Sequence, residues 1–412
     1  MMIGLLQFKC ASNSYAIKTK VRFIKKMGKI IAIFCLLICL KTESAYSQSD
    51  SALINSLLKD IAASQVKTDG EFYAGMFPSF RECGGAPHNY QPDNNIFFTA
   101  ITAFTLKNLS PYLNNDNKKI AEKIIEDATK AFPNYKNQFG DPFYNFWPTH
   151  APIMPHTYYF KYLKSVFGQG EDADDSVMIL MAADNDDSSN AILKKRMIEV
   201  SNLSKKKIIS TYKKYRPYPA YSTYLGKRMT PDFDFAVHCN ILYFMLSKKL
   251  PLVKQDSATI HLLAEMIKDR QYMTAPTYLS PYYVKSSILI YHTARLMTAF
   301  HIPELEQYKS QLIKDAEILL QKNNNVMDQI ILRTSLLRLG AKAPRLNINS
   351  LEEFENSNQK QYIFFQARAA FSYPTPFKQI FLHWSYITYY FYCPAYNKAL
   401  WLEYLIQRNL EM

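Results

Sequence analysis

Residues 235–246 read FAVHCNILYFML, a run that is apolar on nearly every side of a helix. A helix with apolar residues all round must be enclosed on every side. Five more stretches share this character, at residues 96–106, 176–183, 282–297, 326–339 and 381–392. None has the roughly 18 clean apolar residues that a bilayer-spanning helix needs. We therefore expect protein, and not lipid, to enclose these six helices.

Amphipathic segments alternate with the apolar ones. In residues 118–132, Ile120, Ile124 and Ala128 recur at a spacing of four, with lysine and glutamate opposite. Such a stripe is typical of a helix that covers a core with one face. The same pattern occurs in residues 53–66, 190–203, 258–270 and 304–321. Inner apolar helices paired with outer amphipathic ones predict an all-α fold, a single (α/α)6-type toroid. No strand of useful length is expected, and residues 362–365 come nearest to one.

Composition supports a folded chain and excludes some functions. The 412 residues are 48% hydrophobic and 20% charged, which allows a sizeable core and argues against disorder. Only 11 glycines occur, and neither a phosphate-binding loop nor a dinucleotide-binding glycine motif is present. Nucleotide binding through these motifs is therefore excluded.

The first 47 residues have the pattern of a targeting segment. Lysines precede an apolar run over residues 30–40, and small residues Ala45 and Ser47 flank a cleavage position before Gln48. This order is typical of a secretory signal peptide. We expect residues 1–47 to be an N-terminal extension and signal peptide, with the true start at Met27. Residues 48–412 would form the toroid domain, exported to the periplasm or secreted, with no integral membrane span in the mature chain.

The charge pattern argues against nucleic-acid binding. About half of the formal net charge of +14 lies in the predicted leader, and the rest is spread over helix faces without a concentrated stripe. Cys83, Cys239 and Cys393 remain after cleavage and form no C-x-x-C motif. An oxidising compartment would permit one disulfide, but we expect three buried or partly buried thiols.

The loops that lead into the apolar helices are long and rich in proline, aromatic residues and acids. Residues 69–94, 132–175 and 212–234 are examples. In a toroid the inner helices run parallel, so these loops gather on one rim. Long structured loops on a rigid scaffold are a common place for function. The sequence therefore predicts one functional rim, at the amino ends of the inner helices.

Two acidic pairs or clusters fall at this rim. Asp172, Asp174 and Asp175 open one apolar helix, and Asp232 and Asp234 precede the next. Aspartate is a preferred helix cap, so capping alone is one interpretation. Crowded carboxylates also raise one another's pKa, whereas a helix amino end lowers it. Ligand binding and acid catalysis therefore stay open beside capping.

The string D-A-D-D-S at residues 172–176 resembles the D-x-D-D-T/S motif of class II terpenoid cyclases of the squalene–hopene cyclase type. Residues 232–242 resemble a D-x-D-x-x-V-x-x-N-x-L stretch of related toroid proteins. The likeness is to the terpenoid cyclase and protein prenyltransferase superfamily, over residues 70–300. It implies a lyase or isomerase that acts on an apolar substrate. It implies Asp174 as the proton donor, supported by Asp172 and Asp175.

Two other functions fit the same rim. Carbohydrate binding or processing would use the acids Asp232 and Asp234 on hydroxyls and aromatic rings as stacking platforms, namely Tyr144, Trp147, Tyr158, Tyr218 and Tyr221. A non-catalytic protein would use the rim to meet a partner. The expected ligand is thus a small apolar molecule or an oligosaccharide. We expect no cofactor and no metal, because the adjacent His238 and Cys239 face different directions and suit a core better than a zinc site.

Overall fold

The computed structural model describes residues 50–410, except for 151–169, 227–229, 358, 360–361, 369–373, 375 and 383. The chain divides into two compact units, Met1–Leu53 and Ile54–Met412. The first contains the predicted leader, which lies outside the described residues. The second is mostly helical and contains the rim predicted above.

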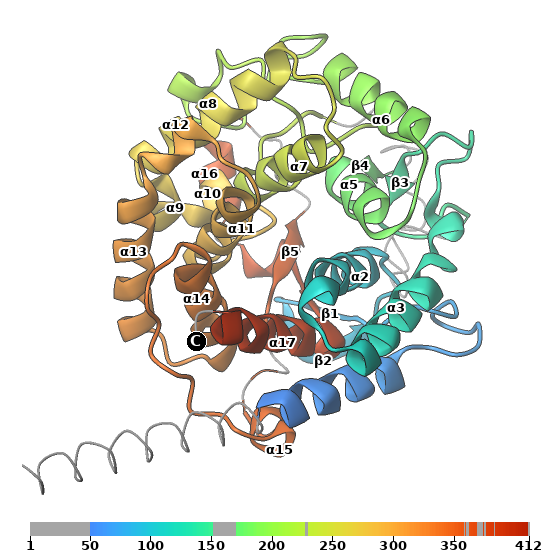
Figure 1. Ribbon diagram of the computed structural model, residues 1–412. Helices are drawn as coiled ribbons and strands as arrows, with labels where there is room; N and C mark the ends of the chain where they lie inside the picture. Colours follow the sequence, from blue (N-terminus) through green and yellow to red (C-terminus); the bar gives the residue numbers. More distant parts are fainter. Residues whose placement is uncertain are drawn as a thin grey trace, which may run out of the picture. The chain divides into compact units, whose positions relative to one another are not determined.

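The sequence predicts six inner helices. Five helices of the second unit lie at the predicted positions, and a sixth, at Pro394–Leu410, lies elsewhere in the sequence. They are α2 (Phe97–Leu109), α5 (Ala173–Ala182), α7 (Phe235–Ser247), α11 (Ser286–Ala299), α14 (Val326–Arg338) and α17 (Pro394–Leu410). Each packs against the next in this order, and α17 packs against α2 (Figure 1). Almost every residue of α5 and α7 is buried, as a helix apolar on every side requires.

Side-chain contacts show how these helices are directed. At the amino ends, Phe97 of α2 lies 6.1 Å from Tyr283, just before α11, and Ser287 of α11 donates to Asp328 of α14. At the carboxyl ends, Lys107 of α2 donates to the Ala182 carbonyl of α5 at 3.1 Å. Thr298 of α11 donates to the last residue of α14. Like ends meet in these pairs, so the helices concerned run parallel.

Amphipathic helices pack on these six. α3 (Asn115–Thr129) contacts α2, α6 (Asp187–Glu199) contacts α5, α8 (Lys254–Lys268) contacts α7, and α13 (Lys309–Lys322) contacts α14. In α3, Ile124 and Ala128 of the predicted stripe are buried together with Ala121, and Ile120 is half-buried. A further helix covers residues 50–64. The shorter helices are α9 (Gln271–Thr274), α10 (Pro276–Leu279), α12 (Pro303–Glu306), α15 (Leu351–Glu355) and α16 (Phe377–Phe381).

The expectation of a chain without useful strands is wrong. A four-stranded antiparallel sheet has the order β2 (Ala86–Pro92), β1 (Phe80–Cys83), β6 (Thr388–Tyr392) and β5 (Phe365–Arg368). Residues 381–392, predicted as an inner helix, end α16 and form β6, and α17 takes the sixth inner place. The run is apolar as expected, but the backbone groups of β6 pair with β1, which is distant in sequence, and with β5, which is close to it.

This sheet lies against the amino ends of the inner helices. The Phe365 ring of β5 is 5.1 Å from Phe97 and 4.9 Å from Phe98, at the start of α2. The backbone N–H of Gln366 donates to the Tyr282 carbonyl at 2.9 Å. A second pair of very short strands, β3 (Tyr144–Asn145) and β4 (Glu171–Asp172), leads directly into α5. Both sheets thus belong to the predicted rim.

Candidate functional site

The start of α5 is fixed by its neighbours on both sides. Asp172 pairs with Tyr144 in the short sheet and also caps α5, accepting the Asp175 backbone N–H at 2.8 Å. The Ser176 hydroxyl donates to the Asp172 carbonyl at 2.6 Å and accepts the Tyr144 N–H at 3.0 Å. Capping by Asp172 is therefore present, as the simplest interpretation required. The cap also orients the two acids that follow it.

Asp174 is buried, and other inner helices supply its partners. Asn240 of α7 donates its amide N–H to one carboxyl oxygen at 2.6 Å, and the Tyr283 hydroxyl donates to the other. Burial raises the pKa of Asp174 to about 7, against the effect of the Tyr283 and Asn240 hydrogen bonds and with the help of the Asp172 charge. Asp174 can therefore gain and lose a proton near neutral pH.

Asp175 is fully buried, and neither of its carboxyl oxygens has a hydrogen-bond partner among the described residues. Burial raises its pKa well above the usual range, and the negative charge of Asp172 adds to the effect. A proton on Asp175 can be donated to the Asp172 carboxylate, which favours the neutral form of Asp175 further. Burial in turn raises the pKa of Asp172 to about 6. Asp172 and Asp175 therefore form a pair that holds one proton.

Asp234 lies at the start of α7 and links it to the loop before α11. One carboxyl oxygen accepts the Ala236 N–H at 2.9 Å and the Ser280 hydroxyl at 2.5 Å, and the other accepts the Tyr282 N–H at 3.0 Å. Burial nevertheless raises its pKa to about 7, and the Asp174 charge contributes. The neighbouring residues Tyr282 and Tyr283 contact Asp234 and Asp174 respectively, so the two acids belong to one cluster.

Asp232 has different surroundings. Its carboxylate accepts the Ser210 hydroxyl at 2.5 Å, and the Lys378 ammonium of α16 lies 4.0 Å away. Lys378 is itself buried, donates to the Ser210 carbonyl at 2.8 Å, and has a pKa lowered by burial. Burial also raises the pKa of Asp232. This pair ties α16 to the loop that precedes α7.

Three side chains not assigned from the sequence extend the Asp174 network inward. The Asn240 amide oxygen lies 3.0 Å from His292 Nδ1 and also accepts the Arg295 guanidinium N–H. Asn240, His292 and Arg295 are all buried. Burial, with the Arg295 charge, lowers the pKa of His292 well below its usual value, so the ring is neutral. In the sequence, these three residues are recognisable only as polar residues within helices that are otherwise apolar on every side.

Aromatic rings surround Arg295 in place of a carboxylate. The guanidinium carbon lies 5.1 Å from the Phe104 ring centre and 5.4 Å from that of Tyr291. Tyr291 donates to Glu403 of α17 at 2.7 Å, and Arg338 of α14 pairs with the same carboxylate at 2.7 Å. Cation–π contacts and this ion pair connect four inner helices through polar groups.

The four predicted stacking residues that the structure describes have different surroundings. Tyr144 is half-buried beside Asp172, whereas Trp147 is half-buried with its indole N–H on Asp93 at 3.1 Å. Tyr221 is fully buried and donates to Asp256 of α8 at 2.9 Å. Tyr218 is half-buried in the same loop. Tyr158 lies outside the described residues. Stacking of a ligand on Tyr221 would require that loop to open.

The cysteine and histidine of α7 lie in the core. His238 is fully buried, its Nε2 lies 2.8 Å from the Tyr221 carbonyl, and burial lowers its pKa to about 4. Burial raises the pKa of Cys239 to about 12. Within the described ranges, no group of three or more His, Cys, Asp or Glu side chains could hold a metal ion. No helix in that part of the chain is long and apolar enough to cross a bilayer.

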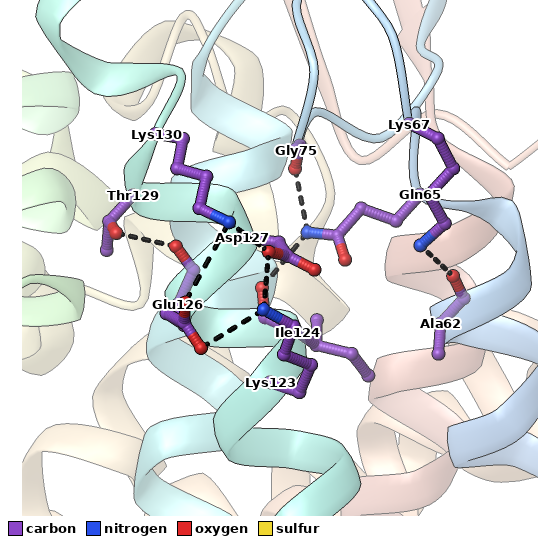
Figure 2. A network of polar contacts seen from close by, with 10 residues as sticks. All are labelled: Ala62, Gln65, Lys67, Gly75, Lys123, Ile124, Glu126, Asp127, Thr129 and Lys130. Atoms are coloured by element: carbon purple, nitrogen blue, oxygen red, sulfur yellow. Dashed lines mark hydrogen bonds and ion pairs between the residues drawn. The ribbon is translucent and has the colours of Figure 1, made fainter.

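A groove of about 270 Å³ lies elsewhere, between residues 62–67 and α3. Figure 2 shows its polar contacts: Gln65 donates to the Gly75 and Ile124 carbonyls, at 2.8 and 3.0 Å. Lys123 pairs with Glu126 and Asp127 at 3.2 and 3.1 Å, so its charge is matched within α3. None of the predicted site residues lines this groove. Its polar groups bond to one another and to nearby backbone carbonyls.

The arrangement at the amino ends can store and release protons in a water-poor setting. Asp174 titrates near neutral pH with two donors that stabilise its ionised form, and a second proton lies on the Asp172 and Asp175 pair. The Tyr283 hydroxyl donates to Asp174, and the Tyr283 ring lies 6.1 Å from that of Phe97; aromatic rings of this kind can stabilise a cation. No protein-family model matches the sequence, and no curated protein matches it either.

Proposed function

We propose that the chain is an exported α/α toroid that acts by acid catalysis on an apolar substrate, with Asp174 as the proton donor. The circuit of contacts from α2 through α17 and back to α2, with paired outer helices, supports the toroid. The leader pattern in residues 1–47 supports export. Buried acids at converging helix ends support acid chemistry.

The observation that carries this proposal is the fully buried Asp175, whose carboxyl faces the acid Asp172 and no hydrogen-bond donor among the described residues. A cap needs one carboxylate, and Asp172 already supplies it. Burying another carboxyl without hydrogen bonds destabilises a fold, so a purely structural role does not account for it. Burial of the carboxyl and the charge of Asp172 raise the pKa of Asp174 to about 7, which matches neutral pH as general acid catalysis requires.

In the proposed step, Asp174 gives its proton to a carbon–carbon double bond. The π electron pair forms the new C–H bond and leaves a cation on the neighbouring carbon, while the Asp174 carboxylate keeps the hydrogen bonds from Asn240 and Tyr283. Loss of a proton from a carbon next to the cation, to water, completes an isomerisation. The hydronium ion formed in that step returns a proton to the Asp174 carboxylate. The reaction class is thus an acid-initiated rearrangement of an apolar alkene.

The test is deuterium incorporation. The mature chain is incubated in D2O with a panel of isoprenoid alkenes, and the products are analysed by mass spectrometry. We expect a product that carries one deuterium, and Asp174→Asn abolishes it. Asp186→Asn is the matched control, because Asp186 also lies at the start of a helix, α6, but is exposed. A labelled product that survives in Asp174→Asn would refute the assignment.

A second function has a specific observation in its favour. Phe377, Ile380, Trp384 and Tyr386 are each more than half exposed, in α16 and the turn that follows. Four large apolar side chains exposed within ten residues indicate a surface that a partner could cover. We infer from them a non-catalytic binding role as the alternative. Replacing Phe377 and Trp384 by serine would abolish partner binding in that case and leave deuterium incorporation unchanged.

A further inference from the structure

We propose that Phe364 covers a ligand subsite between α11 and α17, and that this subsite takes an apolar alcohol. This inference rests on the proposed function in one respect, that both sites lie among the same inner helices. It adds the chemical class of the ligand. It is carried by two observations: the place of the Phe364 ring, and buried polar atoms without partners on the residues around it.

The Phe364 ring is inserted at the amino ends of the inner helices. It lies 5.8 Å from the ring of Tyr283, 5.9 Å from that of His292 and 4.8 Å from that of Tyr396. Its side chain is 1% exposed. Phe364 immediately precedes β5, which is held to the loop before α11 by the Gln366 N–H. The ring therefore fills a space between α11 and α17 without belonging to either helix.

The tautomer of His292 follows from the hydrogen bonds of Asn240. The amide N–H of Asn240 donates to Asp174, so its oxygen must face His292 Nδ1 and Arg295. An oxygen 3.0 Å from Nδ1 requires a hydrogen on Nδ1. His292 Nε2 then carries a lone pair, and it has no hydrogen-bond partner among the described residues.

Two donors near His292 are also unsatisfied. Arg295 Nη1 has no acceptor in the described part of the chain. The Tyr396 hydroxyl lies near Tyr291 without a hydrogen bond of normal geometry. All three side chains are at least nine-tenths buried. His292 and Tyr396 both contact the Phe364 ring, and Arg295 Nη2 lies 3.3 Å from His292 Nδ1. Buried polar atoms in native proteins nearly always have partners, so these three unsatisfied groups point to a group that they would bind.

The chemistry of these groups selects the ligand. A hydroxyl can donate to His292 Nε2 and, with its own oxygen, accept from Arg295 or Tyr396. The remaining walls are aromatic, which suits an apolar skeleton. A hydrocarbon would leave the three polar atoms unpaired. In the space that Phe364 occupies, an alcohol is therefore preferred over the hydrocarbon that has the same carbon skeleton.

The test measures binding of farnesol and of farnesene, an alcohol and a hydrocarbon with one carbon skeleton. Phe364→Ala removes the ring and is expected to bind farnesol roughly tenfold more tightly than the control Phe354→Ala. Phe354 is equally buried but stacks on Trp401, at 4.6 Å. His292→Phe keeps a ring of similar size and is expected to lose the preference for farnesol over farnesene.

If Phe364→Ala does not fold, Phe364→Leu replaces it, and the unaltered chain offers a second readout. In the chain labelled with 15N-histidine, farnesol should shift the Nε2 resonance of His292 toward that of a hydrogen-bonded nitrogen. Equal binding of both probes, with no shift of Nε2, would show that internal water satisfies these atoms and would overturn the proposal. Selective binding without deuterium incorporation would refute only the proposed catalysis, and turnover without alcohol preference would refute only this subsite.

Discussion

At the scale of single residues, the environment of Asp174 sets opposing effects against one another. Burial and the charge of Asp172 favour the neutral acid, whereas Tyr283, Asn240 and Arg295 favour the carboxylate. The resulting pKa, about 7, is raised from a usual value of 3.8. Between these values the folded chain binds a proton that the unfolded chain releases. The contribution of Asp174 to stability is therefore complete below the lower value and is lost as pH rises through the higher one.

This difference predicts the pH dependence of Asp174→Asn. The free energy of unfolding of the unaltered chain should fall relative to that of the variant between pH about 4 and about 7. The expected change is on the order of 2–4 kcal/mol, at about 1.4 kcal/mol for each unit of pKa. Urea titrations of both chains across this range measure it. His238, whose pKa is lowered to about 4, acts in the opposite direction but in both chains, so it cancels. A difference that stays constant with pH would contradict the raised pKa.

Sequence reasoning reached the acids of this cluster but not their partners. Asp172, Asp174 and Asp175 were readable because acids at a helix start stand out beside apolar neighbours. Asn240, His292 and Arg295 lie in the middle of apolar helices, where one polar residue is as easily a core group as part of a site. Which helix faces meet depends on packing between segments distant in sequence. The role of Asn240 therefore could not be deduced from spacing.

At the scale of elements, the residue that caps α7 also connects this helix to another element. Asp234 accepts the N–H groups of Ala236 and Val237 within its own helix. It also accepts hydrogen bonds from the Ser280 hydroxyl and the Tyr282 N–H, both in the loop before α11. A surface cap such as Asp186 serves only its own helix, accepting the Ser189 N–H. The two positions therefore separate local capping from tertiary bonding.

We expect Asp234→Ala to lower the free energy of unfolding by about 3 kcal/mol, because buried donors in two elements lose their acceptor. Asp186→Ala should lower it by about 1 kcal/mol, the usual cost of a lost cap. Chemical denaturation of both variants gives the comparison. Equal losses would show that the contacts from Ser280 and Tyr282 contribute nothing.

The elements that sequence reasoning placed correctly are those with strong local patterns. The apolar helices α2, α5, α7, α11 and α14 and the stripe of α3 follow from residues close together in the chain. Residues 381–392 were assigned to the wrong element because an apolar run suits a buried helix or a buried strand. Pairing with β1, some 300 residues earlier, decides for the strand: in this pairing Phe80 lies opposite Tyr392.

At the scale of the whole molecule, Glu403 of α17 connects three of the inner helices. It accepts the Tyr291 hydroxyl of α11 and pairs with Arg338 of α14. Its side chain is 1% exposed. The ion pair therefore lies where α17 meets α14 and α11. Loss of one partner would leave Arg338 buried without its counter-charge.

Glu403→Gln should therefore lower the free energy of unfolding by about 3–5 kcal/mol, the range for breaking a buried pair. Glu199→Gln is the matched control, since Glu199 pairs with Arg196 at 3.4 Å but is 40% exposed. That change should cost less than about 1 kcal/mol. Thermal and urea unfolding of both variants measure the two costs. A loss at Glu403 no larger than at Glu199 would contradict a role in joining the inner helices.

The predicted leader concerns the whole chain as the cell makes it. If residues 1–47 direct export, the mature protein should begin at Gln48, and mass spectrometry of the exported protein measures this directly. Ser47→Arg should block cleavage, because the cleavage site requires a small residue there. Lys67→Arg, in the mature part, should have no effect. An intracellular protein that retains residues 27–47 would refute export.

The claim on which the catalytic account depends is that the acids at the amino ends hold protons at neutral pH. Solution NMR of the chain labelled with 13C at the aspartate carboxyl carbons tests it most directly. We expect one carboxyl, missing in Asp174→Asn, to titrate near pH 7, and another, missing in Asp175→Asn, to titrate well above its usual range. If every aspartate in the chain titrates near the usual value of about 4, the cluster stores no proton and the account is wrong.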